Sequence, residues 1–277
     1  MVWDLTAARV AERLGIAWNT ANAASRRGSD VLSGRRGMLV DMVGSLNRED
    51  PAPDKGRGPV ATAVSVVLAW GVILGVVLAF GWLVTHPAGQ GIDAFDDELA
   101  RDIAGERTAD LDRMAEVAAY FGDTMVTLVV SPIVIVAVWV WQRSVAPALF
   151  VALAVLGVGG LYAVVTELLP RDRPPVEILD KGLVPTHSFP SGHVGTATAL
   201  YGLLIVLIWV YARGARWLCV PLALLPLGVV AARLYQGAHH LSDVLTSLAY
   251  SVLWLAVLTA LLLGHRSRRD GSHSRVA

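Results

Sequence analysis

The sequence predicts an all-α membrane protein, a bundle of six transmembrane helices whose functional side chains meet at the outer membrane–water interface. The chain is 55% hydrophobic and 17% charged, with a mean hydropathy of +0.55, whereas soluble domains usually carry more charge. Six apolar runs each approach the roughly 20 residues that a helix needs to cross a bilayer. Lipid cannot satisfy backbone polar groups, which favours helices. The runs span residues 60–85, 125–141, 145–168, 194–211, 217–234 and 244–263.

Residues 1–58 precede the first apolar run and are polar and basic, so we expect a flexible cytoplasmic segment. Residues 10–16, followed by Thr20, are similar to the start of the DNA-reading segment of some transposases. A short amphipathic helix or a translated upstream remnant is the favoured interpretation, because one short segment cannot bury a core. No cleavable signal peptide is expected, because the first apolar run begins only near Pro59.

The positions of basic residues predict the orientation of the helices. Arg143 lies between the second and third runs, and Arg213 and Arg216 lie between the fourth and fifth. The N-terminal segment and the tail of residues 265–277 are also basic. With six spans, all four segments fall on one side, which the positive-inside rule assigns to the cytoplasm. We therefore expect both termini on the cytoplasmic side of a plasma membrane. The outer side then receives residues 86–123, 170–193 and 235–243.

The first outer loop, residues 86–123, is rich in carboxylates. A metal site there is conceivable, but a solvated helix is favoured because Phe95, Leu99 and Ile103 recur at helical spacing. Such a helix could lie on the membrane surface near the entrance to the functional site. The acidic residues are Asp93, Asp96, Asp97, Glu98, Asp102 and Glu106.

A polar gap between the third and fourth runs contains Ser-Phe-Pro-Ser-Gly-His at residues 188–193. The apolar run that follows indicates a helix whose first turn faces this gap. The first backbone N–H groups of a helix have no internal partner, so they can bind an anion. Ser191 and Gly192 would let an anion approach closely, because glycine has no side chain. His193 adds a group that can donate a proton near neutral pH.

Two further motifs lie on the same expected outer side. Residues 171–174 read Arg-Asp-Arg-Pro, and Arg233 is followed after five residues by His239 and after three more by Asp243. Residues four apart share one face of a helix. This spacing would allow the carboxylate to hold the imidazole in one tautomer. The charge pattern and the motifs thus point independently to the same side of the membrane.

Arg-Pro, Pro-Ser-Gly-His and Arg-x5-His-x3-Asp, in this order, resemble the type 2 phosphatidic acid phosphatases. Their superfamily also includes vanadium haloperoxidases and glucose-6-phosphatase-like enzymes. The motifs cover residues 166–243, and the hydropathy pattern extends the likeness to most of the chain after residue 58. Two positions depart from the family: Thr166 replaces the usual lysine and Ala232 replaces the usual serine. Arg171, in the same loop as Arg173, could supply the missing cation.

The resemblance implies a metal-independent lipid phosphate phosphatase that forms a phosphohistidine. In this mechanism His239 is the nucleophile, His193 protonates the leaving alkoxide, and Asp243 accepts a hydrogen bond from His239. Asp243 is also expected to raise the pKa of His239. The implied phosphate-binding residues are Arg173, Arg233, Ser191, Gly192 and Arg171.

We expect no cofactor and no nucleic-acid partner. The 23 basic and 23 acidic residues leave a net charge of zero, which gives no sign of nucleic-acid binding. The single Cys219 cannot form an intrachain disulfide. A zinc site is disfavoured because the two motif arginines would repel the cation. Its ligands would be His193, His239, His240 and Asp243.

The sequence leaves the substrate and the acceptor open. The candidate substrates are phosphatidic acid, phosphatidylglycerol phosphate and polyprenyl diphosphate, each with its tail in the bilayer. A phosphotransferase would use the same residues with an acceptor other than water. A membrane transporter or scaffold with a degenerate site is the alternative from another class, and the complete motif set argues against it. The oligomeric state has no signature in the sequence.

Overall fold

The computed structural model describes residues 58–264, a helical region whose one extended pairing is an isolated bridge between Arg171 and His187. The expected fold class is confirmed for these residues, because six helical segments are long and apolar enough to cross a membrane. The predicted N-terminal segment, apart from Gly58, and the basic tail lie outside the described residues. Expectations about them, including the transposase-like stretch, remain predictions.

Each predicted apolar run corresponds to one helix. A 3-10 turn, Arg213–Leu218, precedes α8, and α9 continues into a π-helical turn, Thr259–Leu263. The six helices are α2 (Pro59–Thr85), α5 (Thr124–Gln142), α6 (Val145–Leu168), α7 (Gly192–Tyr211), α8 (Cys219–Tyr235) and α9 (Leu241–Leu258).

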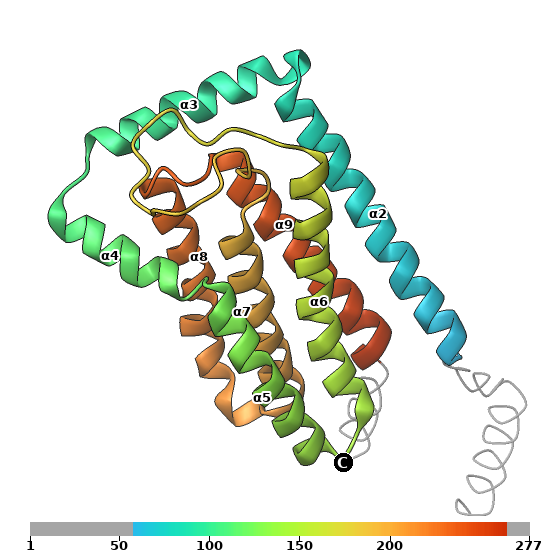
Figure 1. Ribbon diagram of the computed structural model, residues 1–277. Coiled ribbons are helices and arrows are strands. Elements are labelled where there is room, and N and C mark those ends of the chain that lie inside the picture. Colours follow the sequence, from blue (N-terminus) through green and yellow to red (C-terminus); the bar gives the residue numbers. More distant parts are fainter. Residues whose placement is uncertain (1–57, 265–277) are drawn as a thin grey trace, which may run out of the picture. The chain divides into compact units, whose positions relative to one another are not determined.

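The acidic loop forms two further helices, α3 (Gln90–Gly105) and α4 (Ala109–Tyr120). Figure 1 shows α3 across the end of the bundle where α6 ends and α9 begins, and α3 contacts both α8 and α9. The expectation of a helix is confirmed, but the expected apolar face is wrong in part. Phe95 is 56% exposed, whereas Asp96 is only 2% exposed. A carboxylate is buried there because it has a cationic partner in the site.

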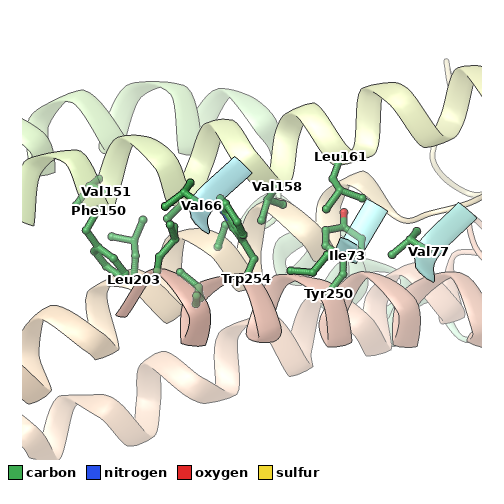
Figure 2. Packing of buried hydrophobic residues seen from close by; sticks show 14 of the residues in the cluster. Val66, Ile73, Val77, Phe150, Val151, Val158, Leu161, Leu203, Tyr250 and Trp254 are labelled. Atoms are coloured by element: carbon green, nitrogen blue, oxygen red, sulfur yellow. The ribbon is translucent and has the colours of Figure 1, made fainter. Parts of the chain in front are cut away.

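The largest buried apolar cluster in residues 58–264 packs α6 against α2, α7 and α9. Apolar residues of α6 recur every three or four positions and are fully buried, and Figure 2 shows this cluster filling the space between α6 and α9. Trp254 of α9 lies against Gly157, where an added Cβ would be 2.3 Å from the indole nitrogen. Trp70 of α2 donates a hydrogen bond to the Gly157 carbonyl at 2.9 Å. Gly157 therefore contacts one tryptophan from each of two neighbouring helices, Trp70 of α2 and Trp254 of α9.

Candidate active site

Three segments meet at one end of the bundle: the loop between α6 and α7, the first turn of α7, and the turn between α8 and α9. A cavity of about 290 Å³ lies among them. It is lined by four of the expected site residues, Arg173, Gly192, His193 and His239. Because antiparallel helices alternate in direction, this end is opposite to the connections that carry Arg143 and Arg216.

The start of α7 matches the expectation from the sequence. Ser191 is the N-cap and Gly192 the first helical residue, so the unpaired N–H groups of this turn lie beside the cavity. An added Cβ at Gly192 would be 3.1 Å from the ring of Tyr162, another cavity residue. Glycine thus allows the ring to approach the helix start. The Ser191 hydroxyl is buried and has no hydrogen-bond partner among residues 58–264.

His239 is buried and held in one tautomer by a backbone group. Its Nδ1 lies 2.7 Å from the Ser188 carbonyl oxygen. A carbonyl can only accept, so Nδ1 carries the proton and Nε2 keeps its lone pair. Burial lowers the pKa of His239 to about 4, and the positive charge of Arg233 acts in the same direction. The imidazole is therefore neutral at neutral pH.

The expected hydrogen bond between His239 and Asp243 is not formed, because His239 Nδ1 and Asp243 Oδ2 are 3.8 Å apart. His239 does not share a helix face with Asp243, because α9 begins at Leu241 and His239 lies in the preceding turn. The expected rise in the pKa of His239 is also wrong, since burial outweighs the nearby carboxylate.

Asp243 is completely buried and acts on His239 through Ser188. Its Oδ2 accepts hydrogen bonds from the Ser188 hydroxyl at 2.6 Å and from the His240 backbone N–H at 2.8 Å. Ser188 thus donates to Asp243 with its side chain and accepts from His239 with its carbonyl. The sequence motifs do not indicate this bridging role of Ser188, because every residue has a backbone carbonyl that can accept a hydrogen bond.

Arg233 is a fully buried cation with unused donors. Its Nη1 donates to Asp180 at 2.7 Å and to Gln236 at 2.9 Å. Its Nε and Nη2 are buried without a hydrogen-bond partner in the described part of the chain. An unsatisfied buried donor costs about 1–3 kcal/mol, and more when it is charged. Such a group indicates a site for an anion.

Arg173 borders the cavity and is oriented by the backbone. It donates to the carbonyl oxygens of Val184 at 2.9 Å, His187 at 3.0 Å and Ala238. Three of its five N–H groups are used in this way, which leaves two for a ligand. Burial lowers the pKa of Arg173, and the nearby charge of Arg233 lowers it further. The positive charges of Arg173 and Arg233 lie close together, and this also favours a bound anion.

Arg171 does not join this anion site, so its expected role as a phosphate ligand does not fit the geometry. It is 6% exposed and donates to Asp243, Ser242, Asp93 and Asp96. Burial alone would lower the pKa of Arg171, but the surrounding carboxylates raise it. Thr166 does not replace the missing lysine either, since it is buried in α6 and its hydroxyl has no partner among residues 58–264.

His240 caps α9 and contacts two carboxylates. Its Nε2 is 3.2 Å from Asp97 Oδ1, and its Nδ1 is 3.4 Å from Asp243 Oδ2. Together with Asp93 and Asp96, Asp97 connects the acidic helix α3 to the site, which the expectation of a solvated helix missed. Within residues 58–264, no group of three or more histidine, cysteine or acidic side chains is arranged to hold a metal ion.

The sequence model of the PAP2 superfamily matches residues 147–266. The fold is similar to the "first transmembrane PAP2 type phosphatidylglycerolphosphate phosphatase from Bacillus subtilis", with 18% identity and a TM-score of 0.56 over 71% of this chain and 94% of that one. Aquifex aeolicus LpxE has 19% identity and a TM-score of 0.48 over 58% and 92% of the two chains.

A comparison with curated proteins finds no match. The matched region, residues 147–266, contains Arg173, the start of α7, and the turn that carries His239. Over this region the chain is similar to the PAP2 superfamily, and the described residues form an all-α fold with six membrane-length helices.

Proposed function

We propose that this protein is a membrane lipid phosphatase that works without a metal ion, through a phosphohistidine intermediate. One observation carries the proposal. A neutral imidazole, His239, lines a cavity with His193 and Arg173. The pKa of His239 is lowered by burial and by the charge of Arg233, whose buried Nε and Nη2 have no partner among residues 58–264. The match of residues 147–266 to the sequence model of the PAP2 superfamily supports the same chemistry.

The first step is attack by His239 Nε2 on the phosphorus of the substrate. The N–P bond forms as the P–O bond to the lipid breaks, and the departing oxygen takes a proton from His193. Arg173 and Arg233 stabilise the charge on the phosphoryl oxygens, as donors that are already oriented before the substrate binds. In the second step a water attacks phosphorus and gives its proton to His193, which releases inorganic phosphate and restores His239.

We propose a substrate that keeps its tail in the bilayer while its phosphate enters the cavity. The cavity lies at one end of six membrane-length helices, which suits such a substrate. Phosphatidylglycerol phosphate is the first candidate, because the B. subtilis structure is named as a phosphatase of this lipid. Phosphatidic acid and polyprenyl diphosphate are the other candidates. The basic connections at the opposite end favour a site on the outer side of the plasma membrane.

The test is release of phosphate by the purified full chain from these three lipids, with EDTA present. We expect turnover of at least one lipid, inhibition by vanadate, and loss of activity in His239→Ala. Release that stops with EDTA and returns with a divalent ion would contradict the metal-free mechanism. If no lipid releases phosphate above the His239→Ala background, the proposed phosphatase activity is contradicted. Phosphate found on an added lipid acceptor would instead identify a phosphotransferase.

A further inference from the structure

We infer that Arg171 is a positioning residue that ties the catalytic Asp243 and His239 to helix α3. The inference rests on the proposed function, because it assigns a role in that reaction. Arg171 Nη1 donates to Asp243 Oδ1 at 2.5 Å and to the Ser242 hydroxyl at 2.7 Å. Its Nη2 donates to Asp93 at 2.8 Å and Asp96 at 3.0 Å. One guanidinium thus joins α9 to α3.

The contact with α3 is a buried ion pair. Asp96 is 2% exposed, and the Arg171 side chain is 5% exposed. Asp96 also accepts hydrogen bonds from the hydroxyl and the backbone N–H of Ser242. A buried carboxylate is stable only when it is paired and hydrogen-bonded. The start of α9 is therefore held against α3 through Arg171 and Ser242 together.

Two routes lead from Arg171 to the nucleophile. The first passes through Asp243, whose other oxygen holds the Ser188 hydroxyl at 2.6 Å. The second is a backbone contact that Arg171→Ala would keep, because the Ser188 backbone N–H donates to the Arg171 carbonyl at 3.0 Å. Both routes end at the Ser188 carbonyl, which fixes the proton on His239 Nδ1. Arg171 thus keeps His239 Nε2 available for attack without touching the substrate.

This role and that of a phosphate ligand predict different kinetics. Loss of a ligand would weaken the binding of substrate and of inorganic phosphate, so KM and the inhibition constant Ki would rise. Loss of a positioning residue would lower kcat while KM and Ki stay nearly constant. A general loss of folding would lower the active fraction, and a melting curve measures that separately.

The experiment uses the full chain in detergent, with p-nitrophenyl phosphate as substrate and inorganic phosphate as inhibitor. For Arg171→Ala we expect kcat to fall about tenfold or more, with Ki changed less than about twofold. Asp96→Asn should lower kcat less, by about threefold, and provides the test if Arg171→Ala does not fold. Arg171→Lys should recover part of the rate. The matched control is Asp102→Asn, an exposed position on α3, which should behave as wild type.

A double variant checks the route through Asp243. If Arg171 acts through this carboxylate, adding Arg171→Ala to Asp243→Asn should cost less than the two single losses combined. Additive losses would overturn the route through Asp243. A Ki raised about tenfold, or an unchanged kcat in Arg171→Ala and Asp96→Asn, would overturn the inference. An inactive wild-type chain would instead contradict the proposed function.

Discussion

Two histidines line the same cavity, but the proposed reaction requires opposite protonation states of them. His239 must be neutral to attack, and burial together with the Ser188 carbonyl provides this state. His193 must supply a proton to the leaving oxygen. Substrates that differ in their need for this proton can therefore separate the two roles.

His193→Ala should slow release from a lipid phosphate about a hundredfold or more, because an alkoxide is a poor leaving group. The same variant should affect p-nitrophenyl phosphate much less, since nitrophenolate leaves without protonation. His239→Ala should reduce both rates on the order of a thousandfold or more. The measurement is the ratio of the two rates for each variant. Equal ratios for the two histidine variants would remove the acid role from His193.

The pKa of His239, lowered to about 4, predicts where the nucleophile is lost. Above this value the neutral form is the major one. We therefore expect His239 to stay neutral as the pH falls through the ordinary histidine range near 6.5, and to become protonated only near pH 4. An NMR titration of the imidazoles, with His239→Gln to identify the signal, measures this. A titration near 6.5 would contradict a buried neutral imidazole.

Asp180 is a residue of the α6–α7 loop that lies outside the motifs yet pairs with Arg233 at 2.7 Å. Its charge offsets part of the positive potential of the anion site. Asp180→Asn should therefore lower the Ki of inorganic phosphate, by about threefold for one partly exposed charge. Glu177→Gln, an exposed position in the same loop, is the matched control. A higher Ki in Asp180→Asn would show that orientation of Arg233 outweighs the change in charge.

Among the elements, α3 has the least obvious part in the site. It lies outside the matched residues 147–266, yet it supplies Asp93, Asp96 and Asp97 to the polar network. The packing of α6 against α2, α7 and α9 has the complementary role, because α7 and α9 begin at the turns that carry the proposed catalytic groups.

Gly157 tests this packing at the scale of helices. In Gly157→Ala the new Cβ would be 2.3 Å from Trp254, so α6 and α9 would have to move apart. Overpacking of this kind costs typically about 1–3 kcal/mol. We expect a lower melting temperature in detergent for this variant. Gly160→Ala is the matched control, since its Cβ would be 3.7 Å from the nearest atom. Equal melting temperatures for the two variants would contradict the close packing of Trp254 against Gly157.

For the whole molecule, the placement of basic residues predicts the orientation in the membrane. We expect a reporter fused after Ala277 to be cytoplasmic, and a cysteine in Lys181→Cys to be labelled from outside. Lys181 is exposed and suits this test better than Gly182, which has a positive φ of 92°. The wild-type chain, with Cys219 alone, is the control. Labelling of Lys181→Cys only after permeabilisation would reverse the proposed topology.

The six helices and the end of the bundle at which the motifs gather could be predicted from the sequence. Hydrophobicity and the length of a membrane span are local properties, so α2 and α5 to α9 follow closely from the apolar runs. The start of α7 at Gly192 was predictable for the same reason, because a Ser-Gly step before an apolar run is a local signal.

Tertiary structure alone decided which partner each polar residue has. Arg171 meets Asp96 across 75 positions of the chain, and Arg233 meets Asp180 across 53. Neither hydrophobic periodicity nor motif spacing records contacts of this kind, which depend on how the helix ends and loops pack. The same holds for His239, which takes its partner from the Ser188 backbone, 51 positions away, because the helix begins two residues too late to align it with Asp243.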